Sequence, residues 1–499
     1  MNDQKRFGPL PALMVAAMSW GAIAGCSETA IQGSVLDFDV ANSPLLQLPL
    51  AVGANSELID VFTVGTGYKY WVLGMTDDIL NAGSAGSEEQ AAMGAPRHQD
   101  SNSHWEQGME AAWSGLKVVN NASVAFTSDV FNTSPIVARG YLISAWGERM
   151  LADAFCALNF GFSIDGGPSL DALGPAASAP DPKVSVGKTE GYRRMAVVAE
   201  LAVAAAQRSV DSGVDNPSNS NPDSDALFEP TRILAGAHGA AAQAYHALAV
   251  YGVDAATNWG LAVQHAGQVP TDFTEVSIHD PDVEINELWD ITWDNDDVTL
   301  FSRADASMPQ GFLGVPATWL WGDDPRVQVQ NCRQNRSGCR RTRSERPERF
   351  DMVVPLKYPD SGADVELVTG GEMRLIEAED ALVNRQDFAT FYNKIDDARA
   401  FHGVDPTERI MTMGALEWPN AEDDAMSILD RERYLEMWME GRRLFDMDRW
   451  NHPFITGNWA LMPRHQEAFD AGGRTRFSCM LTGERECNIN GGLTAGCSR

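Results

Sequence analysis

The densest run of charged side chains lies at residues 431–450, and its spacing suits ion pairing. Residues four apart lie on one face of a helix, and glutamates recur here at that interval. Nearby arginines can meet them in bidentate pairs, and no nucleophile stands beside a base. We therefore predict a structural ion-pair scaffold, in which Arg442 pairs with Glu436 or Glu440. Its members are Glu432, Glu436, Glu440, Arg442, Asp446 and Arg449.

Familiar catalytic motifs are missing from the sequence. It holds no G-x-S-x-G nucleophile elbow, no H-E-x-x-H zinc motif and no P-loop. We therefore predict a binding protein and not an enzyme. Among 69 Asp and Glu residues a glycosidase pair of carboxylates can still be hidden, so a surface hydrolase remains an alternative.

Two sets of residues are candidates for metal binding, and for both a plainer explanation is favoured. His238 and His246 lie eight residues apart on one predicted helix, where packing is the favoured role. An acidic run at residues 280–297 has the carboxylates that Ca²⁺ binds, but it lacks the spacing and the glycine of an EF-hand. We predict a solvated loop and no cofactor, with bound Ca²⁺ as the alternative.

The chain is strongly acidic, and this limits its partners. Its 499 residues include 38 Lys and Arg against 69 Asp and Glu, a formal net charge of −31. Phosphate backbones and anionic headgroups repel such a protein, which excludes a nucleic-acid binder and an electrostatic membrane-surface binder. An arginine-rich run at residues 333–349 is the exception. There a solvated, disulfide-closed loop is favoured over contact with the protein's own acidic surface or with an anionic partner.

The N-terminus resembles that of a bacterial lipoprotein. A short basic region precedes an apolar segment at residues 13–24, which is too short to span a bilayer. The segment ends in Ile-Ala-Gly-Cys, which resembles the lipobox whose cysteine is acylated and becomes the new N-terminus. We predict a signal peptide over residues 1–25, lipidation at Cys26 and a tether over residues 26–38. An ordinary signal peptide with a chance cysteine is the alternative.

Six cysteines remain when Cys26 is set aside, an even number that suits an oxidising compartment. Cys332 and Cys339 enclose six residues of a polar loop, and three other cysteines lie in a glycine-rich tail. Exported loops of this kind are usually closed by disulfides. We predict a disulfide-closed loop and a Cys-rich cap over residues 474–499, with free thiols as the alternative.

Alanine-rich and amphipathic segments predict a mainly α protein. Helices are expected over residues 139–160, 190–210 and 231–252, and again in the C-terminal part of the chain. Residues 253–360 lack a long helical period and are rich in Pro, Gly, Asp and Trp, which predicts loops with short strands and helices. Paired antiparallel helices indicate tetratricopeptide-like stacking. We place them in one domain over residues 39–473.

Three C-terminal segments resemble the SusD/RagB family. Residues 431–450 match the family's run of Glu-Arg, Glu-Gly-x-Arg, Asp and Arg-Trp. Residues 372–379 (EMRLIEAE) are similar to its E-x-R-L-I-x-A-E-A helix, and residues 392–399 to a second helix of the family. The order and spacing agree over residues 370–455, and the N-terminal lipobox agrees independently. The cysteine-bearing tail departs from the family's pattern.

The resemblance implies a surface-exposed lipoprotein of the cell outer membrane with a SusD-like helical fold. Such a protein captures a nutrient, here an oligosaccharide, and passes it to a SusC-like TonB-dependent transporter. Two alternatives remain open. One is a peptide-binding member of the same family, and the other is a tetratricopeptide-like envelope scaffold protein without a small ligand.

Within this expectation, the ligand site draws on the irregular middle of the chain. Sugars offer flat C–H faces that stack on aromatic rings, and hydroxyl groups that need polar partners. Residues 253–330 hold five of the fourteen tryptophans, and loops on a rigid scaffold often display binding groups. We predict ligand contacts from the four tryptophans that lie beside acids: Trp289, Trp293, Trp319 and Trp321. The alternative is that these rings cover the helical core.

Overall fold

The computed structural model describes residues 42–63, 72–73, 76, 78–81, 102–155, 157–158, 186–214, 226–282, 285–294, 298–300, 324–343, 351–414, 416 and 424–452. The described residues are mostly helical, with four short antiparallel sheets between the helices. The prediction of a mainly α chain is therefore confirmed. The predicted signal peptide, lipidation site, tether and Cys-rich tail lie outside the described residues. Within them, no helix is long and apolar enough to cross a membrane.

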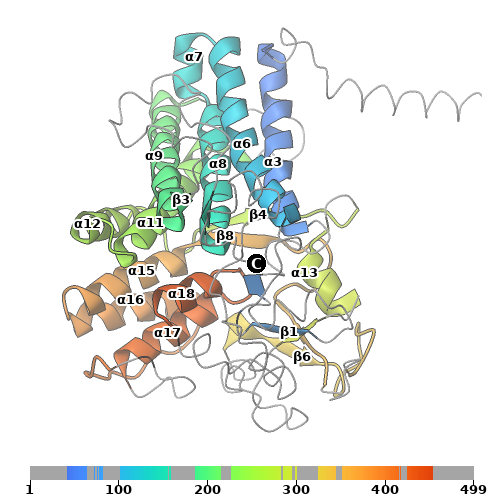
Figure 1. Ribbon diagram of the computed structural model, residues 1–499, viewed down its shortest axis with the longest axis vertical. Helices are drawn as coiled ribbons and strands as arrows, with labels where there is room; N and C mark the ends of the chain where they lie inside the picture. The colour runs from blue at the N-terminus through green and yellow to red at the C-terminus, as the bar shows by residue number, and fades with distance from the viewer. Residues whose placement is uncertain are drawn as a thin grey trace, which may run out of the picture.

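The N-terminal half forms a bundle of long helices that stand side by side (Figure 1). Its central helix is the most buried, since every residue from Pro135 to Ala154 is shielded from solvent. This helix corresponds to the one predicted at residues 139–160, and it ends earlier because the chain turns into a short strand. The helices are η1 (Pro44–Leu46), α3 (Gln47–Thr63), α6 (Asn102–Ala125), α7 (Ser128–Thr133), α8 (Pro135–Ala154) and α9 (Lys188–Ser212).

Glycines allow α6 and α8 to approach each other closely. A Cβ atom on Gly115 would lie 2.4 Å from the carbonyl oxygen of Gly140, and one on Gly147 would lie 2.5 Å from the amide nitrogen of Ala112. Both distances are shorter than van der Waals contact, and both involve backbone atoms that cannot swing away. The absence of side chains at these positions therefore sets the spacing of the two helices.

Two further helices, α11 (Pro230–Val250) and α12 (Ala255–Ala266), continue the helical layer. The Glu229 side chain caps α11 by accepting a hydrogen bond from the amide of Arg232 at 2.6 Å. Alanines fill the buried face of α11, which packs against both α9 and α12. The prediction that residues 253–360 lack longer helices is wrong at its start, because α12 has twelve residues and a buried face of its own.

The C-terminal helices lie beneath the bundle in Figure 1 and pack as neighbours. Side-chain caps start three of them, from Thr369, Asp387 and Asp424. Leu375, Phe391 and their neighbours form a second apolar cluster apart from the main core. Paired helices of this kind fit the predicted tetratricopeptide-like stacking. They are α15 (Gly370–Val383), α16 (Phe388–Phe401), α17 (Ala425–Glu436) and α18 (Arg443–Arg449).

Short elements connect these helical regions, as predicted for the middle of the chain. Strand β4 (Thr274–Ser277) pairs with β8 (Val365–Thr369) directly before α15. The other pairs are β1 (Ile79–Asn81) with β5 (Val298–Leu300), β2 (Ala157–Leu158) with β3 (Val186–Gly187), and β6 (Val329–Asn331) with β7 (Val353–Pro355). The remaining short helices are α13 (Glu287–Trp289), η6 (Asp290–Asp294) and η7 (Pro325–Val327).

Candidate functional site

All six residues of the expected ion-pair scaffold form ion pairs, and their side chains are no more than 3% exposed. The single helix expected to carry them is interrupted. Helix α17 ends at Glu436, the chain reverses with positive φ angles at Met439 and Gly441, and α18 begins at Arg443. The reversal turns Arg442 away from the α17 glutamates. The prediction that Arg442 pairs with Glu436 or Glu440 is therefore wrong.

Arg442 instead joins α8 and α15. Its Nη1 atom donates to Asp153 Oδ2 at 2.5 Å, and its Nη2 atom to Glu372 Oε1 at 3.2 Å. The Tyr192 hydroxyl donates to the other Asp153 oxygen at 2.6 Å. Burial lowers the pKa of Arg442, but the two carboxylates outweigh burial and raise it above its ordinary value. The guanidinium therefore stays charged at the centre of three helices.

A second network surrounds Asp446. Its two oxygens accept from Arg433 Nε at 2.9 Å and from Arg449 Nε at 2.8 Å, and Arg449 also reaches Glu379. His246 Nε2 lies 3.0 Å from the second oxygen of Glu379. Burial alone would raise the pKa of the Glu379 carboxyl, but Arg449 and His246 hold it well below its usual range. These groups lie at the junction of α11, α15, α17 and α18.

The remaining glutamates of the scaffold contact the short elements of the middle region. Glu432 accepts from Arg326 at 3.0 Å and from Arg399 at 2.5 Å. Glu440 accepts from Lys357 Nζ at 2.6 Å, and Lys357 also lies 2.7 Å from Glu366. Burial would lower the pKa of Lys357, but both glutamates raise it well above its ordinary value. These pairs join η7, the segment after β7 and β8 to α16, α17 and the turn that follows α17.

The two histidines of the predicted helix have different partners. His246 is the buried partner of Glu379, and burial lowers its pKa to about 4. His238 Nδ1 lies 2.9 Å from Nδ1 of His265, whose other nitrogen lies 3.1 Å from Glu200. Across the described ranges, no three His, Cys, Asp or Glu residues are arranged to hold a metal ion. Part of the acidic run at residues 280–297 is not described, so the calcium alternative stays a prediction.

An open cavity of about 480 Å³ lies beside the scaffold. We call it the Arg326 pocket. It is enclosed by β4, η7, the segment after β7, β8 and the C-terminal ends of α16 and α17, so it forms where the short elements meet the C-terminal helices. Its lining residues are Thr274, Pro325, Arg326, Gln328, Leu356, Lys357, Glu366, Thr369, Phe401, His402 and Glu436.

The predicted ligand tryptophans differ in their surroundings. Trp293 is 8% exposed, and its indole nitrogen donates to the carbonyl of Pro355 at 3.0 Å. It is therefore a core residue and offers no free face to a ligand, which is the alternative that the sequence left open. Trp289 is partly buried against the main core. Trp319 and Trp321 lie outside the described residues, so their ligand role stays a prediction.

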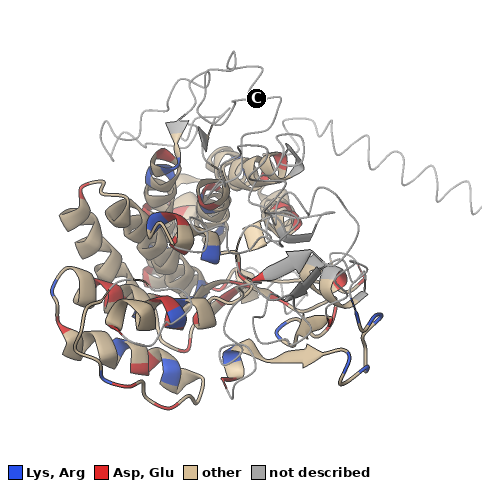
Figure 2. Cartoon of the chain, turned by 60° about the horizontal axis from the view of Figure 1, so that its bottom comes forward, with Lys and Arg blue, Asp and Glu red and all other residues tan. Residues whose placement is uncertain are grey.

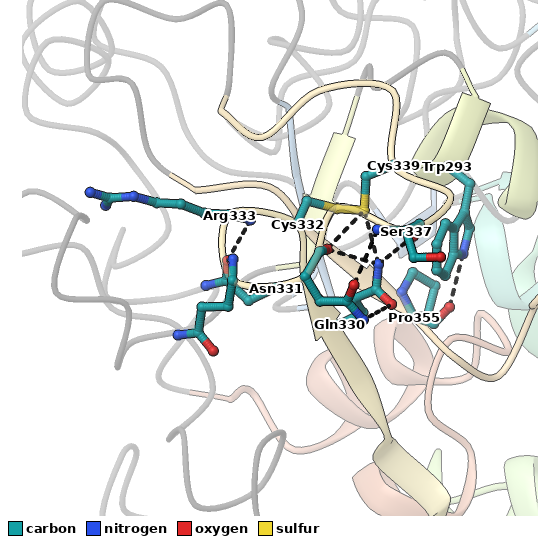
Figure 3. Close-up of a disulfide and its surroundings, with 10 residues drawn as sticks. Trp293, Gln330, Asn331, Cys332, Arg333, Ser337, Cys339 and Pro355 are labelled. Atoms are coloured by element: carbon teal, nitrogen blue, oxygen red, sulfur yellow. Dashed lines mark hydrogen bonds between the residues drawn. A yellow bond between two sulfur atoms is a disulfide. The ribbon is translucent and has the colours of Figure 1, made fainter.

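Trp293 lies under the predicted disulfide-closed loop (Figure 3). A disulfide joins Cys332 to Cys339, which confirms the prediction for this pair. Gln330 Nε2 donates to the carbonyls of Asn335 and Ser337 across the loop, at 3.1 and 2.7 Å. The loop therefore has an internal hydrogen-bond network in addition to its covalent closure.

The same loop carries the positive charge that the sequence places at residues 333–349. Its arginines appear as blue segments at the edge of the molecule in Figure 2. Arg333 Nη1 lies 3.3 Å from Asp351, and Arg343 Nε lies 3.7 Å from the same carboxylate. Both arginine side chains are about half exposed, at 52% and 44%. The exposure of these side chains agrees with the favoured solvated loop, while their pairing with Asp351 is the contact with the protein's own acidic surface that the alternative includes.

Comparison with known proteins identifies the architecture. Residues 372–479 match the model of the SusD family, and this region includes the three motifs and all six residues of the ion-pair scaffold. A chitin-binding SusD homolog from Flavobacterium johnsoniae superposes with a TM-score of 0.57 and 14% identity, over 90% of this chain and 95% of the other. The chain has the SusD fold. The resemblance drawn from the C-terminal motifs is thus confirmed.

Other solved SusD structures agree. A SusD superfamily protein from Bacteroides vulgatus gives a TM-score of 0.53 at 14% identity, over 91% of this chain and 97% of the other. A laminarin-binding SusD-like protein gives 0.54 at 13% identity, over 90% and 98%. A search of curated protein sequences finds no match. At these identities the likeness concerns the SusD fold, which spans nearly the whole chain.

Sequence reasoning found the scaffold of this SusD fold but missed the Arg326 pocket. The motif run contributes only Glu436 to its lining. Lys357 and His402 carry no signal of their own, because Glu440 and Glu436, with which they pair, lie far along the chain. Only the fold brings these side chains together.

Proposed function

We propose that this chain is a glycan-capturing protein of the SusD type. The observation that carries the proposal is the SusD fold, shared over 90% of the chain with one homolog that binds chitin and another that binds laminarin. The C-terminal family motifs support it, and their ionic side chains are engaged in buried structural pairs. Capture of a glycan needs shape, aromatic faces and fixed polar groups, and no bond has to be broken.

In this proposal the protein is held at the outer membrane by lipid on Cys26 and delivers the oligosaccharide to a SusC-like TonB-dependent transporter. The lipobox and the family resemblance support this placement. Mass spectrometry of the native N-terminal peptide tests the anchor, and we expect acylated Cys26 as its first residue. Cross-linking in native outer membranes followed by affinity purification tests the partner. An unmodified N-terminus at another residue would contradict the lipid anchor. Purification without a transporter would contradict the proposed partner.

Calorimetric titration of the purified protein with chitohexaose, laminarihexaose and a six-residue peptide tests the ligand class. We expect saturable binding of at least one glycan and none of the peptide. Binding of the peptide alone would establish the peptide-binding alternative. Binding of no probe, together with stable capture of envelope proteins, would favour the scaffold alternative.

Single replacements of Trp289, Trp319 and Trp321 by alanine locate the contact. A ligand residue loses affinity at an almost unchanged melting temperature. Trp293→Ala serves as the control, since it should lower the melting temperature by removing a buried ring and its hydrogen bond to Pro355. If all of the replacements leave the affinity intact, the glycan binds elsewhere.

A further inference from the structure

The Arg326 pocket holds buried polar atoms to which the described part of the chain gives no hydrogen bond. Arg326 Nη1, Glu436 Oε2 and His402 Nε2 are buried, and none has a hydrogen-bond partner among the described residues. Arg326 Nη1 and His402 Nε2 lie 3.6 and 3.0 Å from Glu436 Oε2, but the geometry is too poor for hydrogen bonds. Buried polar groups of this kind are costly unless a partner satisfies them. A ligand with hydroxyl groups supplies such partners.

The Arg326 and Glu436 side chains are held in place by contacts on the side that faces away from the pocket. The other atoms of the Arg326 guanidinium donate to Asp324 at 2.7 Å and to Glu432 at 3.0 Å. Thr369 Oγ1 donates to Glu436 Oε1 at 3.1 Å. A Cβ atom on Gly371 would lie 1.7 Å from that oxygen, so the glycine leaves room for the carboxylate. The polar floor of the pocket is thus positioned before any ligand arrives, which reduces the entropy cost of binding.

The charges of the pocket favour a neutral ligand. Two cationic side chains, Arg326 and Lys357, face two carboxylates, Glu366 and Glu436. Each cation is already paired with a further carboxylate behind the wall. An anion would therefore meet uncompensated negative charge, while an uncharged ring with adjacent hydroxyls can accept from the guanidinium and donate to the carboxylate.

The rim supplies apolar surface to match. Phe401 is 47% exposed and Leu356 is 41% exposed, and both line the pocket. An aromatic ring beside charged hydrogen-bonding groups suits the C–H face of a sugar and its hydroxyls. A cavity of about 480 Å³ is within the range of small-molecule sites in proteins, and it has room for a short sugar segment.

We propose that the Arg326 pocket is a sugar subsite. It binds one ring of a neutral glycan, with adjacent hydroxyls between Arg326 Nη1 and Glu436 Oε2 and the ring face against Phe401. This inference rests on the proposed capture of glycans and adds a contact point separate from the tryptophans of the middle region. Its residues come from β8, η7, α16 and α17.

The test uses Phe401 on the rim and His402, whose side chain is 27% exposed, because Arg326 and Glu436 are buried and their loss would destabilise the fold. Phe401→Ala and His402→Ala are titrated calorimetrically with chitohexaose and laminarihexaose beside the unaltered full chain. We expect about tenfold weaker binding of the preferred glycan for each, the size typical of one lost contact, at an unchanged melting temperature. Phe401→Tyr keeps the ring and should keep the affinity.

Trp113→Ala is the matched control, since this ring on α6 is also about half exposed, at 46%, and does not line the pocket. It should bind like the unaltered protein. If the unaltered protein binds glycan and Phe401→Ala and His402→Ala bind equally well, the subsite is wrong while the proposed function stands. If the unaltered protein binds neither hexasaccharide, both the proposed function and the subsite are overturned.

Discussion

Arg442 Nη1 lies 2.5 Å from Asp153 Oδ2, although the two residues are 289 positions apart in the chain. Asp153 belongs to the last turn of α8 in the N-terminal bundle, and Arg442 directly precedes α18. Both side chains are buried, and the same guanidinium reaches Glu372 on α15. One guanidinium therefore joins the C-terminal helices to the bundle by pairing with both carboxylates.

Replacement of Arg442 by alanine should destabilise the protein strongly. The change leaves Asp153 and Glu372 buried without their cation, and removal of one partner of a buried pair typically costs about 3–5 kcal/mol. Urea unfolding at pH 7 measures the loss of unfolding free energy, and the melting temperature should fall with it.

Arg193→Ala provides the matched comparison. Arg193 pairs with Glu190 three residues before it on α9, and its side chain is 47% exposed. Exposed pairs of this kind contribute less than about 1 kcal/mol. Equal stability losses in the two variants, or an unchanged stability of Arg442→Ala with lost glycan binding, would contradict a structural role of Arg442.

Gly115→Ala should separate α6 from α8. The new Cβ would lie 2.4 Å from the backbone oxygen of Gly140, so the helices must move apart. Overpacking of this kind typically costs about 1–3 kcal/mol. Gly260→Ala on α12 is the control, because no heavy atom of the described residues lies within 4 Å of its Cβ position. There the gain in helix propensity should raise stability by up to about 1 kcal/mol. The same sign of change in both variants would contradict the assigned role of Gly115.

The sequence predicts the helices better than it predicts what they touch. The period of apolar residues is a local signal, so it predicts α9 and α11 to within about two residues at each end and α8 to within about six. Helix α12 was missed because its surroundings are rich in Pro, Gly and Asp. The break after Glu436 was missed because charge spacing alone cannot reveal the positive φ angle at Met439.

The candidate site shows the same limit. The motif run identifies charged residues that are buried, yet Arg442 finds its partners on α8 and α15, which no local spacing encodes. The Arg326 pocket is built from segments that span residues 274 to 436. Such a cavity depends on the register of β4 against β8 and on the position of α16, so it emerges only from the fold.

Stability should fall as the pH drops from about 6.5 to about 4, and His246 should account for part of this. Burial lowers its pKa from 6.5 to about 4 in the folded protein, with Glu379 opposing that shift. The unfolded chain therefore binds more protons in this window, so protonation favours unfolding. The full stabilisation is present above pH 6.5, and roughly 3 kcal/mol is lost near pH 4.

His246→Gln removes this titration while keeping a polar side chain toward Glu379. Urea unfolding at several pH values between 4.5 and 7 should show that the unfolding free energy of the variant falls less steeply with decreasing pH than that of the unaltered protein. The two slopes should differ by close to one proton taken up on unfolding. His104 and His238, whose pKa values burial lowers to about 3 and about 4, keep part of the dependence in the variant. Parallel stability curves for the two proteins would mean that the pKa of His246 is the same in the folded and the unfolded protein, which would contradict the prediction.

Closure of the loop between Cys332 and Cys339 should protect it from proteolysis. The buried Cys332, the hydrogen bonds of Gln330 and the contact of Gly338 with Trp293 hold the loop against the body of the protein. A double replacement by alanine, Cys332→Ala with Cys339→Ala, restores loop entropy to the unfolded chain and should cost roughly 2 kcal/mol of unfolding free energy. Trypsin should then cut faster at the exposed Arg333 and Arg336, which mass spectrometry of the fragments can follow.

Replacing both cysteines is preferable to adding a reductant, because a reductant also acts on the cysteines of the C-terminal tail. An unchanged cleavage rate at Arg333 and Arg336 would show that the hydrogen bonds across the loop are sufficient to hold it without the covalent bond.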